Sequence, residues 1–143
     1  MTTVSEVIRK KGSDIYSIVP DASVLDAMKL MDEANTGALL VMAGDRVEGI
    51  VSERDCVRKV DVQGRSSRDT KVREIMTEKV MYVNPSQPLE ELMVLMTEKN
   101  IRHMPVFNGD KLLGVISMRD VLREVAAEQK FLISQLEYYI KNG

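Results

Sequence analysis

The sequence repeats itself at a spacing of 65 residues, and this repeat constrains the fold more than any other feature. One shift of 65 positions, without gaps, brings Gly49 onto Gly114 and Arg54-Asp55 onto Arg119-Asp120. The same shift aligns further identical residues: Pro20 with Pro85, Met28 with Met93, Met31 with Met96, Asn35 with Asn100, Val41 with Val106, Gly44-Asp45 with Gly109-Asp110, Ser52 with Ser117, and Arg58 with Arg123. Such a period indicates that one supersecondary unit is built twice.

Each copy predicts the element order β-α-β-β-α. A short extended piece ends at Pro20 or Pro85, and a helix with apolar residues at i, i+3, i+4 and i+7 follows. An apolar strand comes next, at 38–42 or 104–107, and a glycine turn leads to a return strand at 47–51 or 112–116. Because glycine adopts positive φ at little cost, these turns predict hairpins. A second helix begins at Ser52 or Ser117.

We therefore expect an α+β fold, with two β-α-β-β-α repeats packed through their sheets in pseudo-twofold symmetry. One repeat alone offers little core, which favours this shared packing. The expected segments are the first repeat at 4–60, a polar linker at 61–70, the second repeat at 71–125 and a C-terminal helical extension at 126–143.

The C-terminal helix carries an apolar seam of its own. Steps of three and four residues connect Leu122, Val125, Gln129, Leu132, Leu136 and Tyr139, and Ile133 and Ile140 widen the seam. This is the a/d pattern of a coiled coil. The helix could fold back on its own domain or dock a partner, but the pattern favours self-association.

Composition excludes several classes of function. Hydrophobic residues make up 44% of the 143 residues and the net charge is −2, so the chain lacks the basic surplus of a general nucleic-acid binder. The single cysteine, Cys56, permits no intrachain disulfide. No apolar run is long enough to span a bilayer, and the N-terminus lacks the features of a secretory signal. We expect a cytoplasmic protein without a nucleic-acid or membrane partner.

The candidate site is a motif of the form Gly-x-x-Ser-x-x-Asp at the entry to each second helix. It runs from Gly49 to Asp55 and again from Gly114 to Asp120. One interpretation is a capping box, in which serine and aspartate satisfy amides at the helix start. The other is a ligand site, because a helix start favours phosphate and an aspartate could accept from ribose hydroxyls. The glycine would then let a ligand approach the strand closely.

Nothing in the sequence predicts catalysis. No Walker A loop and no Gly-x-Gly-x-x-Gly motif is present. The repeat partner of Cys56 is Val121 on an apolar helix face, so we expect a small buried thiol and not a nucleophile. His103 is the only histidine and has no cysteine pair beside it, so we expect no metal site. We predict that the chain is not an enzyme.

The repeat, its motif and the segment 102–106 (Arg-His-Met-Pro-Val) together resemble a tandem pair of cystathionine-β-synthase (CBS) domains, also called a Bateman module. The resemblance covers residues 4 to 125, and the stretch 62–67 further resembles stand-alone CBS-pair proteins of bacteria and plant organelles. It implies that Ser52 and Ser117 contact phosphate and that Asp55 and Asp120 hold ribose.

The resemblance also implies the remaining ligand contacts. Adenine would lie against backbone and apolar side chains of Tyr16, Ser17, Ala38, Leu39, Val80, Met81, His103, Met104 and Pro105. Arginines could neutralise the phosphates, with Arg102 the strongest candidate, followed by Arg54, Arg58, Arg65, Arg119 and Arg123. Copy one has Gly37-Ala38 where copy two has Arg102-His103, so the two sites should differ in affinity.

The function implied is a regulatory sensor that binds AMP, ADP, ATP or NAD in the cleft between the repeats and needs no further cofactor. It would modulate its own dimer state or an unidentified protein partner, and we expect a homodimer. The alternative is a ligand-independent dimerisation or protein-interaction module whose Ser-x-x-Asp motifs only cap helices.

Overall fold

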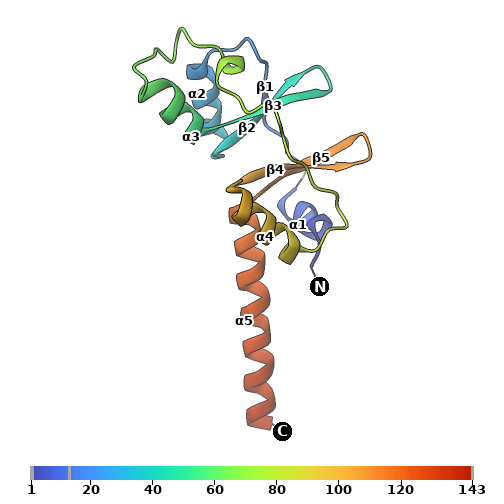
Figure 1. Cartoon of the computed structure of the whole chain (residues 1–143). Helices are drawn as coiled ribbons and strands as arrows, with labels where there is room; N and C mark the ends of the chain where they lie inside the picture. The colour runs from blue at the N-terminus through green and yellow to red at the C-terminus, as the bar shows by residue number, and fades with distance from the viewer. Residues whose placement is uncertain (1, 13, 143) are drawn as a thin grey trace. The chain divides into compact units, whose positions relative to one another are not determined.

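The computed structural model describes residues 2–12 and 14–142, which form two compact units (Figure 1). One unit runs from Asp14 to Met81. The other combines the N-terminal segment with everything from Tyr82 onward. The compact units therefore differ from the expected repeat segments, because the first helix of the chain joins the second repeat, and residues 71–81 remain with the first.

The unit from Asp14 to Met81 holds a three-stranded sheet in the order β1-β2-β3. Strand β1 is parallel to β2, and β2 and β3 form an antiparallel hairpin. Its elements are β1 (Ser17–Ile18), α2 (Val24–Ala34), β2 (Ala38–Ala43), β3 (Arg46–Ser52), α3 (Glu53–Cys56), the π-helical segment η1 (Val57–Asp61) and the 3₁₀ turn η2 (Val72–Glu74).

The other unit is built around the equivalent hairpin. Val83 makes a single parallel bridge to Val106, in the place that β1 has in the first copy. The elements are α1 (Val4–Lys11), α4 (Leu89–Lys99), β4 (His103–Asn108), β5 (Lys111–Ser117) and α5 (Met118–Asn142). The predicted α+β class and the continuation of the last helix into the C-terminal segment are confirmed.

The backbone conformation of the first copy recurs at the equivalent positions of the second copy. Asn35 and Asn100 end their helices in the left-handed conformation, with φ of 52° and 54°. The register shift between Val41 and Met42 in the first hairpin recurs between Val106 and Phe107 in the second. Positive φ at Gly44 and Gly109 closes the two turns, as the sequence predicts.

Each unit contains its own apolar core. Val24, Met31 and Leu39 belong to a buried cluster of the first unit. In the other unit, Val4, Val7 and Ile8 of α1 are buried in a cluster with α4 and β4 residues such as Leu92 and Met104. Each cluster also contains side chains from the segment assigned to the other repeat: α1 residues in one, and Val72 and Ile75 in the other.

Other parts of the same chain pack closely against the two motif glycines, Gly49 and Gly114. A Cβ atom at Gly49 would lie 2.7 Å from the Thr77 carbonyl oxygen and 2.9 Å from Met76 Sδ. Thr77 is fixed there by a bridge to Ile50. A Cβ at Gly114 would lie 3.3 Å from Ile8 Cδ1. Local packing therefore accounts for both glycines, and the close approach of a ligand to these strands stays a prediction.

None of the helices in the described part of the chain is long and apolar enough to cross a membrane.

Because the two glycines have different neighbours, we expect substitution by alanine to lower the free energy of unfolding by different amounts at the two positions. We expect Gly49→Ala to lower the free energy of unfolding by about 1–3 kcal/mol, because backbone must move. Gly114→Ala should cost less than about 1 kcal/mol, because the tip of the Ile8 side chain can shift. Urea denaturation of both variants measures the difference, and equal costs would contradict this account of the packing.

Candidate functional site

The hairpins place both candidate motifs at the end of a strand ladder. Ser52 is the last residue of β3 and pairs with Ala38, and Ser117 ends β5 opposite His103. The next amide donates across the hairpin, from Glu53 to the Gly37 carbonyl at 3.0 Å and from Met118 to the Arg102 carbonyl at 2.8 Å. The position of each helix start is therefore set by the residue just before β2 or β4.

Both Ser-x-x-Asp motifs form capping boxes. In copy one, the Asp55 amide donates to Ser52 Oγ at 3.2 Å, and the Ser52 amide donates to Asp55 Oδ2 at 3.0 Å. In copy two the corresponding distances are 3.0 and 2.9 Å for Asp120 and Ser117. The first and third amides of each helix are therefore occupied. Only the second, from Arg54 or Arg119, has no acceptor among the described residues.

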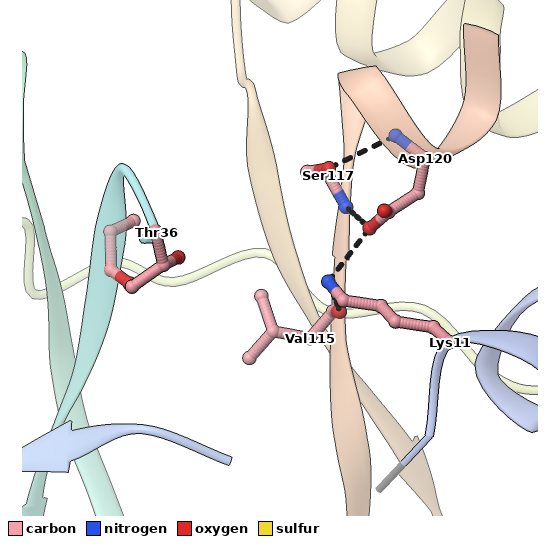
Figure 2. A network of polar contacts seen from close by, with 6 residues as sticks. Lys11, Thr36, Val115, Ser117 and Asp120 are labelled. Carbon is pink, nitrogen blue, oxygen red and sulfur yellow. Dashed lines mark hydrogen bonds and ion pairs between the residues drawn. The ribbon is translucent and has the colours of Figure 1, made fainter. Parts of the chain in front are cut away.

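Copy two also receives a lysine from outside the repeat. Lys11 Nζ, in the last turn of α1, lies 2.7 Å from Asp120 Oδ2 and 2.8 Å from the Val115 carbonyl oxygen (Figure 2). In copy one, Lys59 Nζ lies 3.1 Å from Asp55 Oδ1, one turn further along the same helical segment. Sequence reasoning missed Lys11, since it lies in a segment that the repeat does not cover.

The charges around Asp120 shift two pKa values. Burial of Asp120 tends to raise its pKa, but hydrogen bonds from Lys11 and Ser117 outweigh burial and hold the pKa below its ordinary value. Burial lowers the pKa of His103, and the positive charges of Lys11 and Arg102 lower it further. His103 is therefore neutral at pH 7, when its ring offers one donor and one acceptor.

Five of the six predicted arginines carry no ion pair among the described residues. Arg65 differs, because its Nη2 lies 2.6 Å from Glu74 Oε1. The arginines without a carboxylate partner are all exposed and lie in α3, in η1, in α5 or just before β4: Arg54, Arg58, Arg102, Arg119 and Arg123. Their charge is free to meet an anion.

The residues predicted to contact adenine do not all lie on the same face of their strands. The side chains of Leu39 and Met104 lie in the two apolar cores, so only their backbones are accessible to a ligand. Ala38, His103 and Pro105 alternate with them and point to the opposite face of their strands. Tyr16, which is 41% exposed, accepts a hydrogen bond from the Leu40 amide through its carbonyl, and Ser17 pairs with Leu40. Val80 and Met81 lie outside helices and strands.

The predicted site residues fall into two groups that the hairpins hold together locally. The unit from Asp14 to Met81 carries Tyr16, Ser17, Ala38, Leu39, Ser52, Arg54, Asp55, Arg58, Arg65, Val80 and Met81. The other unit carries Arg102, His103, Met104, Pro105, Ser117, Arg119, Asp120 and Arg123. Each group contains one capped helix start, unpaired arginines and a strand face beside it.

Cys56 is buried, as the repeat predicts, and it is not poised as a nucleophile. Burial raises the pKa of its thiol to about 11, and the carboxylates of Asp55 and Glu53 add to the effect. Within residues 2–12 and 14–142, no three histidine, cysteine, aspartate or glutamate side chains gather in a group that could hold a metal ion.

Comparisons with known proteins agree with these features. The profile of the CBS domain family matches residues 4–62 and 72–127. The chain is 40% identical over 151 residues to the mitochondrial CBS domain-containing protein CBSX3 of Arabidopsis thaliana, covering 99% of this chain and 73% of the relative. A solved structure of a protein with CBS domains from Burkholderia ambifaria MC40-6 is 50% identical, with a TM-score of 0.86 over 90% of this chain and 96% of the other.

A more distant structure shares the fold. The CBS domain pair of protein MJ0100, solved in complex with 5′-methylthioadenosine and S-adenosyl-L-methionine, is 20% identical, with a TM-score of 0.78 over 90% of this chain and 98% of the other.

The lowered pKa of Asp120 predicts a pH-dependent contribution to stability. Because its folded-state pKa lies below the ordinary value of 3.8, the carboxylate stabilises the fold at neutral pH and loses this effect as the pH falls through the folded-state pKa. We expect Asp120→Asn to lower the free energy of unfolding at pH 7. Its difference from the wild type should shrink as the pH falls below 3.8.

Urea denaturation between neutral and acidic pH measures this difference. The matched control is Asp110→Asn in the exposed β4–β5 turn, which should follow the wild-type profile. A difference for Asp120→Asn that stays constant with pH would show that its charge does not stabilise the fold.

Proposed function

Because this chain belongs to the CBS domain family, we propose that it is a regulatory module that binds an adenine nucleotide at its Ser-x-x-Asp helix starts. Membership confirms the resemblance found in the sequence. CBS-domain pairs are typically regulatory and not catalytic, and the relative in Arabidopsis thaliana is named only for its CBS domains. The proposal adds the ligand class, the residues that bind it and the consequence of binding.

The observation that carries the proposal is the free positive charge beside two helix starts in a chain whose net charge is −2. Arg54 and Arg58 flank one motif, and Arg102, Arg119 and Arg123 flank the other, all without a carboxylate partner among the described residues. Arginine forks bind phosphate oxygens in pairs, so these side chains suit a nucleotide phosphate. The second-position amides of Arg54 and Arg119 would add a hydrogen bond each.

A ribose can be accommodated without dismantling the second capping box. The bonds to Asp120 converge on Oδ2, so Oδ1 has no donor among the described residues. A ribose hydroxyl could donate to Oδ1 while the cap stays closed. In copy one, Asp55 accepts from Ser52 through Oδ2 and pairs with Lys59 through Oδ1, so a ribose hydroxyl would have to share Oδ1 with the lysine.

The second motif should therefore bind more tightly than the first. It has an open carboxylate oxygen, and it alone has Arg102 and the neutral His103, which could hydrogen-bond to a base or a hydroxyl.

The adenosine compounds bound to MJ0100 support the ligand class at the level of the fold. AMP, ADP, ATP and NAD share the adenosine and phosphate that these residues would recognise. A nucleotide that binds two states of the protein with different affinity would shift the balance between them, and thereby change the dimer or the binding of a protein partner.

One observation favours a second candidate function. Both motifs are closed as capping boxes, and Asp120 already has a cationic partner in Lys11. If these contacts only hold the helices in place, the chain is a ligand-independent dimerisation or interaction module.

The role of Arg102 gives a direct test of nucleotide binding. We expect isothermal titration to show saturable binding of AMP, ATP or NAD to the wild type. Arg102→Ala should weaken it by about 10-fold or more, because a charge-assisted hydrogen bond contributes about 1.5–3 kcal/mol. Arg68→Ala, which removes an exposed arginine outside the predicted site, is the matched control and should bind as the wild type does.

The alternative makes the opposite prediction. No heat and no thermal shift with any of the three nucleotides at millimolar concentration would reject the sensor. Stability losses in Asp55→Ala and Asp120→Ala, with no nucleotide response in the wild type, would support the purely structural role.

A further inference from the structure

Helix α5 extends away from the other elements of its unit (Figure 1). Its contacts with α1 and the N-terminal segment occur early, where Lys10 Nζ lies 2.8 Å from Glu124 Oε1 and the Thr2 hydroxyl donates to Glu128. From Gln129 to Asn142 every residue is exposed. A helical segment of this length is only marginally stable alone in water, so a covering partner would stabilise it.

The exposed segment carries an apolar stripe. Leu132 and Leu136 are 60% and 61% exposed, and Ile133, Tyr139 and Ile140 are 57%, 69% and 83% exposed. In the heptad that begins at Leu122, Leu136 is an a position, Leu132 and Tyr139 are d positions, and Ile133 and Ile140 are e positions. These three rows are adjacent on a helix, and polar residues cover most of the remaining surface.

We propose that a second copy of this chain covers the stripe, with the two α5 helices antiparallel and centred on Ser134. In this register Leu132 lies against Leu136 of the second copy, and Gln129 lies against Tyr139 of the second copy. Both contacts occur twice by symmetry. Ile133 meets its own equivalent across the axis, and Ala126 meets Ile140 of the second copy. In this single register every a, d and e position from 126 to 140 faces another such position, and the one contact that is not wholly apolar joins Gln129 to the phenol of Tyr139.

Charge complementarity favours the antiparallel orientation. Lys130 and Glu137 flank Ile133 at spacings of three and four residues, on the face beside the stripe. The antiparallel register places Lys130 near Glu137 of the second copy on both sides of the axis. A parallel, in-register pair would place these residues and their equivalents on opposite sides of the helix pair, where Lys130 could not reach Glu137 of the second copy.

The available area suits self-association. If one fully exposed side chain of this kind presents roughly 150–200 Å², the five exposed residues of the stripe offer on the order of 600 Å² per chain. A standard protein interface takes roughly 800 Å² from each partner. Helix α5 therefore supplies most of what a stable pair needs without any contribution from the nucleotide motifs, and this proposal does not depend on nucleotide binding.

The first test is the mass of the full chain by sedimentation velocity and light scattering. We expect Leu132→Glu with Leu136→Glu to halve the mass of the wild-type assembly, because two charges would lie in each core layer. The matched control is Phe131→Glu, which removes a side chain that is 64% exposed but lies at a c position outside the stripe. It should keep the wild-type mass.

A charge exchange tests the register. Lys130→Glu and Glu137→Lys should each weaken association, and the double variant should restore it, because the pair is re-formed with its signs reversed. These two residues are seven positions apart, too far to pair within one helix.

Spin labels test the orientation. Cysteines at Ser134 or Lys141 occupy equivalent f positions and can be labelled in a Cys56→Val background, valine being the type that the second repeat carries there. At 1.5 Å rise per residue, an antiparallel pair separates the Lys141 labels along the axis by about 20 Å more than the Ser134 labels. Equal distances at the two positions would overturn the antiparallel arrangement. A monomeric wild type at tens of micromolar, or a mass unchanged by Leu132→Glu with Leu136→Glu, would overturn self-association through α5.

Discussion

Each half of this protein depends on the reciprocal capping of a helix by the serine that ends the preceding strand. Ser52 and Ser117 are at once the last residues of a hairpin ladder and the caps of the helices that follow. In each motif the serine and the aspartate both close the helix cap and form the candidate ligand site. The same atoms therefore contribute to the stability of the fold and to the proposed binding of a ligand. Of the capping groups themselves, one amide per helix is open to a ligand and, in copy two, so are Asp120 Oδ1 and the Ser117 hydroxyl hydrogen, which have no partner among the described residues.

The two copies differ after the cap, and the difference has local causes. In copy one, the Val62 amide donates to the Val57 carbonyl in a π-type turn, and Gly64 then takes a positive φ of 70°. In copy two, Ala126, Ala127 and Glu128 are strong helix formers, so α5 continues for 25 residues. Lys11 adds a second asymmetry, because it gives Asp120 a partner from outside the repeat. The duplicated unit has thereby acquired two non-equivalent candidate sites and one long exposed helix.

Much of this architecture could be predicted from the sequence, because the same helix caps, turns and apolar patterns occur in both copies of the repeat. Asn35 and Asn100, the glycine turns and the two caps all lie where short-range chemistry places them. What could not be predicted depends on contacts distant in sequence. The approach of Met76 and Thr77 to Gly49, the burial of α1 against the second hairpin and the Lys11–Asp120 pair have no periodic signature. The capping and ligand readings of Ser-x-x-Asp use the same residues, so the pattern alone could not separate them, and the ligand contacts remain predictions.

The most direct measurement of the central claim is an amide NMR titration of the ¹⁵N-labelled chain with AMP. The Ser117 and Ser52 amides donate to the capping carboxylates, so their resonances report on any group that binds there. If the nucleotide uses the capped helix starts, the signals of Ser117 and Arg119 shift saturably, those of Ser52 and Arg54 shift at higher AMP concentration, and that of Val7 in the α1 core stays in place. Unchanged Ser117, Arg119, Ser52 and Arg54 signals at millimolar AMP, in a spectrum that remains folded, would contradict the account.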